Sequence, residues 1–420
     1  MLLHDVELNR LSKVLKVDLK YFSRTSVFTV SESVISMFIT LVVTFFLANY
    51  LSVEGYGLYT LIFTFLTTAS IFSLKGLTQS VVRSVSRGHY GTYTTSLKYQ
   101  MVASLVGSLF LIGVALWYLI KIQDMSMFIL LLLLAFFLPL YSTAELYVMY
   151  FTGRKDFKKL FFLKILAKVI LAIGSIYITI VYKSPIFLLV FICLATSALG
   201  LFYNYSIISQ IKKTTAEVDF SDITYGLKLS FLTSLNKFVG VLDKYIFVFI
   251  GSLSGLATYG VALGISDSFY ALVKSATHPI LPKISSVQNL NKKYISRFFF
   301  YALIGGFLIY GVVYLFLDFL IPLFFPKYLS SISYAKILSF NLLCIPNILV
   351  TQYMHVRHLA GRLTKVIALG KLTQVLGLII LVPSMGVEGI IIAHVAPGVV
   401  QLLVNGMYLF SSEERKSNLL

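Results

Sequence analysis

Long apolar segments dominate this sequence, and a short polar connection separates each one from the next. Twelve such segments recur between residues 25 and 410. A helix of about 20 apolar residues crosses a hydrocarbon core of roughly 30 Å. The pattern therefore predicts twelve transmembrane helices, at residues 25–49, 57–82, 99–120, 126–150, 165–182, 186–209, 229–250, 259–280, 298–320, 332–354, 366–384 and 389–410.

The composition supports an all-α integral membrane protein. Hydrophobic residues make up 58% of the chain and charged residues only 12%, whereas about a quarter of the residues in a soluble domain are charged. Cys193 and Cys344 both fall within predicted helices. We interpret them as small buried hydrophobes, and not as a disulfide or a metal site.

The connections differ in charge between the two sides of the predicted membrane. Outside the helices, 25 Lys and Arg residues lie on the side of the N-terminus, against Lys121, Lys183 and Lys327 on the other side. Because cytoplasmic connections are rich in Lys and Arg, this distribution predicts that both termini are cytoplasmic. The net charge of +18 then reflects orientation and contact with anionic membrane lipid. It gives no support for nucleic acid as a partner.

The chain divides into two halves of six predicted helices. The sequence LSVEGYGLY at residues 51–59 is similar to LSGLATYGVA at 253–262, and Lys75 and Lys274 follow at matching positions. Because each half has an even number of helices, the two halves are expected to be parallel repeats, as in secondary transporters. The expected domains are an amphipathic cytoplasmic segment at 1–24, an N-terminal lobe at 25–209, a cytoplasmic linker at 210–228, a C-terminal lobe at 229–410 and a cytoplasmic tail at 411–420.

Charged side chains inside the predicted helices are the candidate functional residues. A charge at the centre of a transmembrane helix costs about 2.5–3.5 kcal/mol, so most of these residues must face water or a partner. Lys residues outnumber carboxylates in the helices, which predicts a cationic cavity that attracts anions. The candidate substrate-binding residues are Lys75, Lys274, Lys237 and Lys244. The candidate ion-coupling residues are Glu32, Asp243 and Asp267.

Structural roles for the polar residues stay open. A long Lys side chain can reach the membrane interface from within a helix, and this alternative applies to Lys336, Lys371 and Lys168 as well as to Lys75, Lys237 and Lys274. For Asp243 and Lys244 the alternative is a structural ion pair between helices. His278 and His394 fit hydrogen bonding between packed helices. Pro346 in the tenth helix and Pro397 in the twelfth predict kinks.

Four motifs resemble those of a known transporter family. They are LANYLSVEGYGLYTLIF, LKGLTQSVVRSVSRG, VLDKYIFVFIGSLSGLATYGVA and VPSMGVEGIIIAHV. Together they resemble the polysaccharide-export branch of the multidrug/oligosaccharidyl-lipid/polysaccharide (MOP) transporter superfamily, which includes the Wzx-type O-antigen flippases. The resemblance covers essentially the whole chain.

This resemblance implies a V-shaped, MATE-like bundle of twelve helices. It also implies a substrate, an oligosaccharide linked to a polyprenyl pyrophosphate of the undecaprenyl type, which moves from the inner to the outer leaflet of the bacterial cytoplasmic membrane. The role would lie in O-antigen, lipopolysaccharide or other polysaccharide biosynthesis, with a polysaccharide polymerase as a candidate partner.

Other functions would require features that differ from those of this sequence. No catalytic arrangement, metal-ligand spacing, phosphate-binding Gly loop or ATP-binding domain is recognisable, so the sequence predicts neither an enzyme nor a cofactor. Energy would come from the membrane potential or from proton or sodium antiport. A multidrug exporter of organic cations is expected to have surplus carboxylates and aromatic rings. A polysaccharide polymerase or ligase is expected to carry a sizeable outer loop, whereas the longest outer loop predicted here has about eleven residues.

Overall fold

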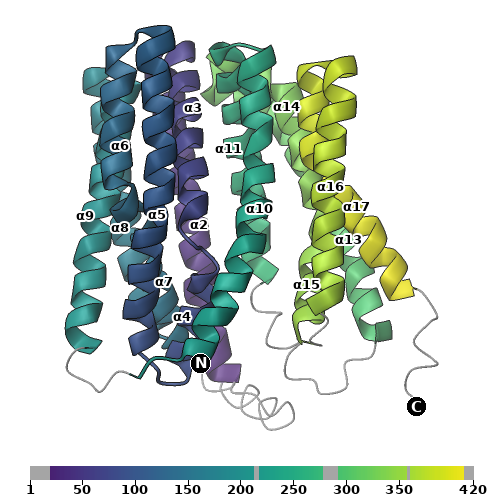
Figure 1. Cartoon of the computed structure of the whole chain (residues 1–420). Coiled ribbons are helices and arrows are strands. Elements are labelled where there is room, and N and C mark those ends of the chain that lie inside the picture. The colour runs from purple at the N-terminus through teal and green to yellow at the C-terminus, as the bar shows by residue number, and fades with distance from the viewer. Residues whose placement is uncertain (1–18, 212–216, 278–291, 357–359, 411–420) are drawn as a thin grey trace. The chain divides into compact units, whose positions relative to one another are not determined.

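The computed structural model of the chain consists of helices joined by short connections (Figure 1). It describes residues 19–211, 217–277, 292–356 and 360–410, and within those ranges it contains no β-strand. Most of the predicted amphipathic segment, His278 and the predicted tail lie outside the described residues.

Figure 1 labels the helices in chain order. In the first half they are α2 (Leu19–Tyr50), α3 (Val53–Ala69), η1 (Ser70–Phe72), α4 (Leu77–Ser86), α5 (Gly91–Trp117), η2 (Tyr118–Ile122), α6 (Met125–Thr143), α7 (Leu146–Gly153), α8 (Phe157–Tyr182) and α9 (Pro185–Ile211). In the second half they are α10 (Phe220–Ile250), α11 (Leu253–Thr277), α13 (Lys292–Phe324), η3 (Pro326–Tyr328), α14 (Ser331–Leu338), η4 (Ser339–Cys344), α15 (Pro346–Val356), α16 (Ala360–Met385) and α17 (Val387–Phe410).

Eleven helical segments of the described residues are long and apolar enough to cross a membrane. Helix α10 has 31 residues and takes the place of the seventh predicted helix. It is not among the eleven, and it carries five charged residues, Asp222, Lys228, Lys237, Asp243 and Lys244. With α10 included, the order of helices agrees with the twelve that the sequence predicts. The chain is an all-α, multi-pass membrane protein.

The contacts divide the chain into two compact units. The N-terminal unit comprises residues 42–257, and the C-terminal unit comprises Met1–Leu41 together with Thr258–Leu420. The boundaries fall within α2 and α11, so α10 groups with the first half of the chain. This grouping differs from the predicted lobes at 25–209 and 229–410, and the two six-helix repeats stay a prediction.

Each unit has its own core. In the N-terminal unit, Ile62 and Leu134 belong to one cluster of buried apolar residues and Tyr93 to another. In the C-terminal unit, Phe299 lies in a cluster formed by α13, α15, α16 and α17. Lipid tails are as apolar as these side chains, so close van der Waals packing is a main source of helix association in a membrane. Cys193 belongs to the first cluster and is a buried free thiol, as predicted.

The second predicted helix, at residues 57–82, is interrupted between η1 and α4. In the interruption, Leu74 adopts a left-handed backbone with a φ of 51°, which is uncommon for a residue other than glycine. The Ser73 hydroxyl donates a 2.7 Å hydrogen bond to the carbonyl oxygen of Ser70, one turn back. The expectation that Lys75 lies within a continuous apolar helix is therefore wrong. Lys75 lies in the interruption.

The fourth predicted helix, at residues 126–150, is interrupted as well. The hydroxyls of Ser142 and Thr143 donate to the carbonyl oxygen of Pro139, at 3.2 and 2.9 Å. Hydroxyl bonds of this kind, together with a proline, bend a helix because they compete with its backbone bonds. Helix α6 ends at Thr143, and Glu145 lies in the turn before α7.

The tenth predicted helix, at residues 332–354, is divided into α14, η4 and α15. Helix α15 begins at Pro346, so the kink predicted there is confirmed. The Asn347 amide donates to the carbonyl oxygen of Gly398 on α17, at 2.9 Å. Helix α17 continues through Pro397.

Helices α4 and α10 approach each other closely at Gly76, the residue before α4. A Cβ atom on Gly76 would lie 2.3 Å from the backbone nitrogen of Ser230 and 2.5 Å from the carbonyl oxygen of Gly226. The backbone N–H of Gly76 donates to the Ser230 hydroxyl at 3.0 Å. Only glycine fits here, and this contact fixes the lower end of the interruption against α10.

Candidate functional site

Lys75 binds the end of a neighbouring broken helix. Its ammonium group donates a short hydrogen bond to the carbonyl oxygen of Ser142, in the last turn of α6. The last four carbonyls of an α-helix lack partners within the helix, and the helix dipole favours a positive charge at that end. The next carbonyl, of Thr143, accepts a 3.2 Å hydrogen bond from the Asn204 amide. Lys75 therefore has a structural role as a cap of α6.

Two further charged residues act on Lys75. Lys237 of α10 and Glu145 both interact electrostatically with Lys75, and Glu145 also acts on Lys237. We call these three residues the Lys75 cluster. It brings together the two helix interruptions and α10, and its two Lys and one Glu leave one positive charge in surplus. Two of the four predicted Lys residues, Lys75 and Lys237, thus interact electrostatically in the structure.

Glu145 is the member of the cluster that the site prediction omits. Glu145 lies near the end of the predicted helix at residues 126–150, where a charged side chain can reach the membrane interface. The signal that identifies it is the run Pro139 to Thr143, because a proline followed by hydroxyl residues predicts an interrupted helix. A polar residue that directly follows such a run, as Glu145 does, is then expected at the interruption of the helix.

The other candidates on α10 have different surroundings. Asp243 is completely buried, and its carboxylate accepts a 2.9 Å hydrogen bond from the backbone N–H of Lys244. Lys244 is half-buried. The neighbouring Tyr245 hydroxyl hydrogen-bonds the Thr68 hydroxyl of α3 at 2.7 Å. The Tyr245 bond attaches the later part of α10 to α3.

The remaining candidates lie in the C-terminal unit. Glu32 on α2 is buried and accepts a 2.9 Å hydrogen bond from the Ser36 hydroxyl, one turn further on. Asp267 and Lys274 lie on α11, and both are exposed. The predicted partnership of Lys274 with Lys75, which belongs to the other unit, stays a prediction.

An ion-pair network that sequence reasoning missed joins α4 to the start of α10. Asp222 is buried and accepts a 2.7 Å hydrogen bond from the Ser84 hydroxyl. Its carboxylate also lies 3.1 Å from Arg83 and 3.7 Å from Arg87. Asp219 caps α10 by accepting from the backbone N–H of Asp222. The pairing joins residues about 140 positions apart, so no local pattern reveals it.

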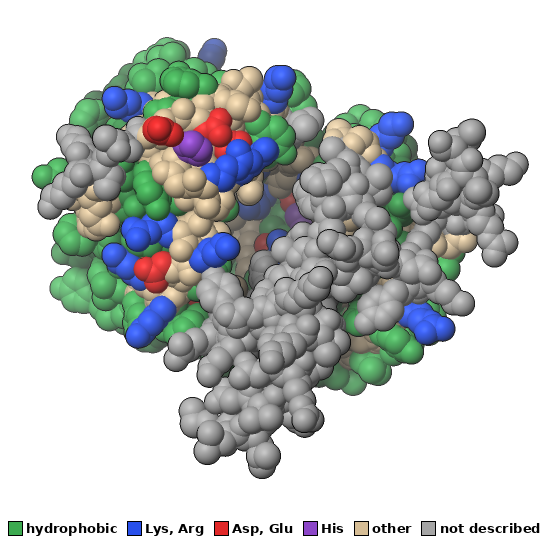
Figure 2. Space-filling view, turned by 90° about the horizontal axis from the view of Figure 1, so that it is seen from below, with side chains coloured by type: hydrophobic (Ala, Val, Ile, Leu, Met, Phe, Trp, Pro, Cys, Tyr) green, Lys and Arg blue, Asp and Glu red, His purple; other side chains and the backbone are tan. Residues whose placement is uncertain are grey.

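The face on which α4 and the start of α10 lie is rich in basic side chains. Figure 2 shows Lys and Arg side chains distributed over this face, with a few acidic side chains and a His among them. The side chains of His89, which follows α4, and Glu217, which precedes α10, lie 3.4 Å apart. A basic face of this kind is what the distribution of charge in the sequence predicts for the cytoplasmic side.

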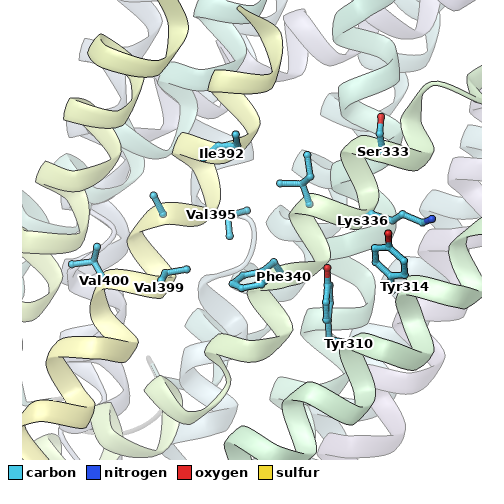
Figure 3. Close-up of a pocket in the computed structure, with 11 residues that line it drawn as sticks. Tyr310, Tyr314, Ser333, Lys336, Phe340, Ile392, Val395, Val399 and Val400 are labelled. Atoms are coloured by element: carbon cyan, nitrogen blue, oxygen red, sulfur yellow. The ribbon is translucent and has the colours of Figure 1, made fainter. Parts of the chain in front are cut away.

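A pocket of about 600 Å³ lies in the C-terminal unit between α13, α14, η4 and α17 (Figure 3). Its wall is mostly apolar and aromatic, with Tyr310, Tyr314 and Phe340 side by side. Lys336 lies 2.7 Å from the carboxylate of Asp318 and 4.2 Å from the centre of the Tyr314 ring. Because Asp318 compensates the charge of Lys336, this pocket has no surplus charge for an anion.

A second pocket, of about 370 Å³, lies in the N-terminal unit between the interruption that contains Glu145 and helices α8 and α9. Lys164 and Lys168 of α8 line it together with Glu145. We call it the α8 pocket. In the described part of the chain, no group of three or more His, Cys, Asp or Glu residues is arranged to hold a metal ion.

Solved transporter structures share this fold. An outward-facing multidrug resistance MATE family transporter of the MOP superfamily is 15% identical, with a TM-score of 0.60, and the match covers 93% of this chain and 94% of that one. An inward-facing structure of such a transporter is 14% identical, with a TM-score of 0.60 and coverages of 91% and 97%. A MOP superfamily transporter from Pyrococcus furiosus is 13% identical, with a TM-score of 0.60 and coverages of 93% and 94%. At such identities the similarity shows the fold.

The helices, their order and these structural matches show that the chain has the fold of the MOP superfamily transporters. Residues 23–288, more than half of the chain, match the model of a family described as polysaccharide biosynthesis proteins. The chain belongs to this family. A comparison with curated protein sequences gives no significant match.

Proposed function

We propose that the chain is a flippase for an anionic lipid-linked oligosaccharide. Its substrate would be an oligosaccharide repeat unit, such as that of O-antigen, on a polyprenyl pyrophosphate of the undecaprenyl type. The observation that carries the proposal is the Lys75 cluster, in which two Lys and one Glu from the two helix interruptions and α10 interact electrostatically. Membership of a polysaccharide biosynthesis family supports a saccharide cargo.

The proposed mechanism is alternating access around a cationic cavity. The pyrophosphate would replace the Ser142 carbonyl as a partner of Lys75, while Lys237 adds a second positive charge. Lys is a compact point charge that suits a phosphate that must later be released. The polyprenyl tail would stay in the lipid. Lys244 and Lys274 are proposed to contact the same head group at other stages of transport.

The membrane potential favours this direction of transport. Moving one charge across 100 mV changes the free energy by about 2.3 kcal/mol, so the outward movement of two negative charges gains roughly 4–5 kcal/mol in a cell with a negative interior. Potential alone can therefore drive the transport. Antiport of protons or sodium through a carboxylate would add to it.

A multidrug exporter of organic cations is the alternative with the same fold. Several structural neighbours are MATE transporters, but a cationic substrate would be repelled by a cluster with surplus positive charge. The Pyrococcus furiosus neighbour is described as a MOP superfamily transporter whose binding pocket has reversed polarity, which suggests a different function. The basic cluster of the present chain favours an anionic cargo over a cationic one. The short outer loops that the sequence predicts favour a transporter over a polymerase or a ligase.

The proposed function is tested in proteoliposomes that contain the purified protein. A polyprenyl-pyrophosphate-linked sugar placed in one leaflet should appear in the other leaflet faster than in protein-free vesicles. Uptake of a fluorescent organic cation, measured in parallel, should stay at the protein-free rate. Cation transport without movement of the glycolipid would refute the proposal in favour of a multidrug exporter.

We expect at least one of the predicted coupling residues to control the dependence of transport on pH or sodium. Glu32 and Asp243 are buried and Asp267 is exposed, and a carboxylate that exchanges ions during transport must be reached by water in one conformation. In the same proteoliposomes, Glu32→Gln, Asp243→Asn and Asp267→Asn are compared over a range of pH and of sodium concentration. Unchanged dependences in all three variants would leave the membrane potential as the driving force.

Both termini are proposed to lie in the cytoplasm, with the chain in the bacterial cytoplasmic membrane. In a variant without Cys193 and Cys344, single Cys residues at Ser52 and Ser330 should react with an impermeant thiol reagent on intact cells. A Cys at Ser86 should react only after the membrane is opened. All three side chains are exposed, so burial does not protect them. The reverse labelling pattern would contradict the proposed topology.

A polysaccharide polymerase stays a proposed partner.

A further inference from the structure

The α8 pocket is a charged site inside a membrane-spanning part of the chain. Lys164 and Lys168 are four residues apart, so they lie on the same face of α8. They are seven and eleven residues beyond Phe157, where the helix begins, which places them about 10 and 16 Å along its axis. Helix α8 has 26 residues and is about 39 Å long, so both lie in the half nearer its start. Both side chains are half-buried.

The balance of charge in this pocket favours an anion. Its lining contains two Lys and one Glu, together with Tyr147 and Tyr203. Exposed basic residues precede it on the chain and begin α8, namely Arg154, Lys155, Lys158 and Lys159. Clustered charges of one sign raise the local concentration of ions of the other sign. An anion at this face is therefore drawn toward the start of α8 and the pocket above it.

The outer side of α8 offers a surface for an apolar chain. Phe162 and Leu166 alternate with the two Lys along this helix and are 57% and 53% exposed. Side chains of this kind on a spanning helix face lipid tails. A molecule with an anionic head and a long apolar tail matches both the pocket and its surroundings.

Glu145 connects the α8 pocket to the Lys75 cluster. It lines the pocket, and its charge acts on Lys75 and Lys237. The turn formed by Ala144 and Glu145 therefore contributes to the pocket and, through Glu145, to the Lys75 cluster. An anionic head group in the pocket would lie beside Glu145, the residue that also interacts with Lys75.

We propose that the α8 pocket binds the phosphate head group of an anionic lipid laterally, from the inner leaflet, before the head group reaches the Lys75 cluster. Lys164 and Lys168 hold the phosphate, and the tail lies along α8 in the bilayer. The identification of this lipid as a polyprenyl pyrophosphate rests on the proposed function. The site and its ligand class rest on the pocket.

The test measures binding of farnesyl pyrophosphate and of inorganic pyrophosphate to the full-length protein in nanodiscs of zwitterionic lipid. The double variant Lys164→Gln with Lys168→Gln should bind farnesyl pyrophosphate about tenfold more weakly, because hydrogen bonds to a charged group are the strong ones. Lys183→Gln, at the other end of the same helix, is the matched control and should bind as wild type does. Glu145→Gln should bind more tightly, because it removes a repelling carboxylate.

The binding results separate failure of the lateral site from failure of the proposed function. Wild-type affinity in the Lys164 and Lys168 variant, together with weaker binding in Lys75→Gln, would overturn the lateral site and leave the proposed function intact. Absence of pyrophosphate-lipid binding to the wild type would overturn the proposed function. Equal affinity for inorganic pyrophosphate would refute a lipid ligand. Weaker binding in Glu145→Gln, or equal loss in the Lys183 control, would also contradict the proposal.

Discussion

Replacing Lys75 by Glu should abolish transport of the lipid-linked oligosaccharide. The substitution removes the positive charge, leaves the Ser142 carbonyl without its donor and places a second carboxylate beside Glu145. Lys237→Glu should have a similar effect on transport without removing the cap of α6. Both variants are measured in proteoliposomes at matched amounts of inserted protein.

Two milder variants separate the charge of Lys75 from its structural role. Lys75→Gln keeps a donor for the Ser142 carbonyl but removes the charge, and it should lower the rate by about ten- to a hundredfold. Lys75→Arg keeps the charge with a different shape, so it should retain partial transport. Wild-type transport by Lys75→Gln would show that Lys75 only caps α6 and that the substrate does not depend on its charge.

Replacing Gly76 by Ala should severely reduce the yield of folded protein. The new methyl group would lie 2.3 Å from a backbone nitrogen of α10, and a backbone atom cannot move aside as a flexible side chain can. Overpacking typically costs about 1–3 kcal/mol and sometimes more. Monodispersity after detergent extraction and thermal stability of the extracted protein measure the effect.

Gly113 on α5 provides the control for this substitution. Nothing lies within 4 Å of the position that its Cβ atom would occupy. Gly113→Ala should therefore leave the protein as stable as wild type or make it slightly more stable, since Ala is favoured over Gly in a helix. Equal stability of the Gly76 and Gly113 variants would contradict the close contact between α4 and α10.

The fold was largely predictable from the sequence. An apolar run of about 20 residues has few alternatives to a membrane helix, because every backbone polar group must be satisfied within the segment. The position of Pro346 also revealed where the tenth helix is divided, because proline lacks the N–H that a helix interior needs. The apolar runs and the proline are both local features, so they can be recognised in a single sequence.

The interruptions at Lys75 and Glu145 were harder to predict. Leu74 carries the left-handed backbone of the first interruption, although leucine has no preference for that conformation. What holds it is tertiary contact, since Gly76 packs against Ser230 on a helix more than 150 residues away. Composition and periodicity do not report such contacts.

The sequence identified two of the three residues of the Lys75 cluster, because tertiary contacts also determine which residues the cluster contains. Lys75 and Lys237 were selected because charges are costly in lipid, and the structure brings them together. Glu145 was left out because it is near a predicted helix end, although the broken helix places it within the cluster. The pairing of Asp222 with Ser84 and Arg83 was missed entirely, because it depends on how α4 meets α10.

Mass spectrometry of the lipids that co-purify with the gently extracted protein tests the central claim most directly. The account predicts a polyprenyl pyrophosphate that carries a glycan in the wild-type sample. It also predicts strong depletion of that lipid in a variant that combines Lys75→Glu with Lys237→Glu. Bulk phospholipid alone in the wild type, or equal amounts of the glycolipid in both samples, would contradict it.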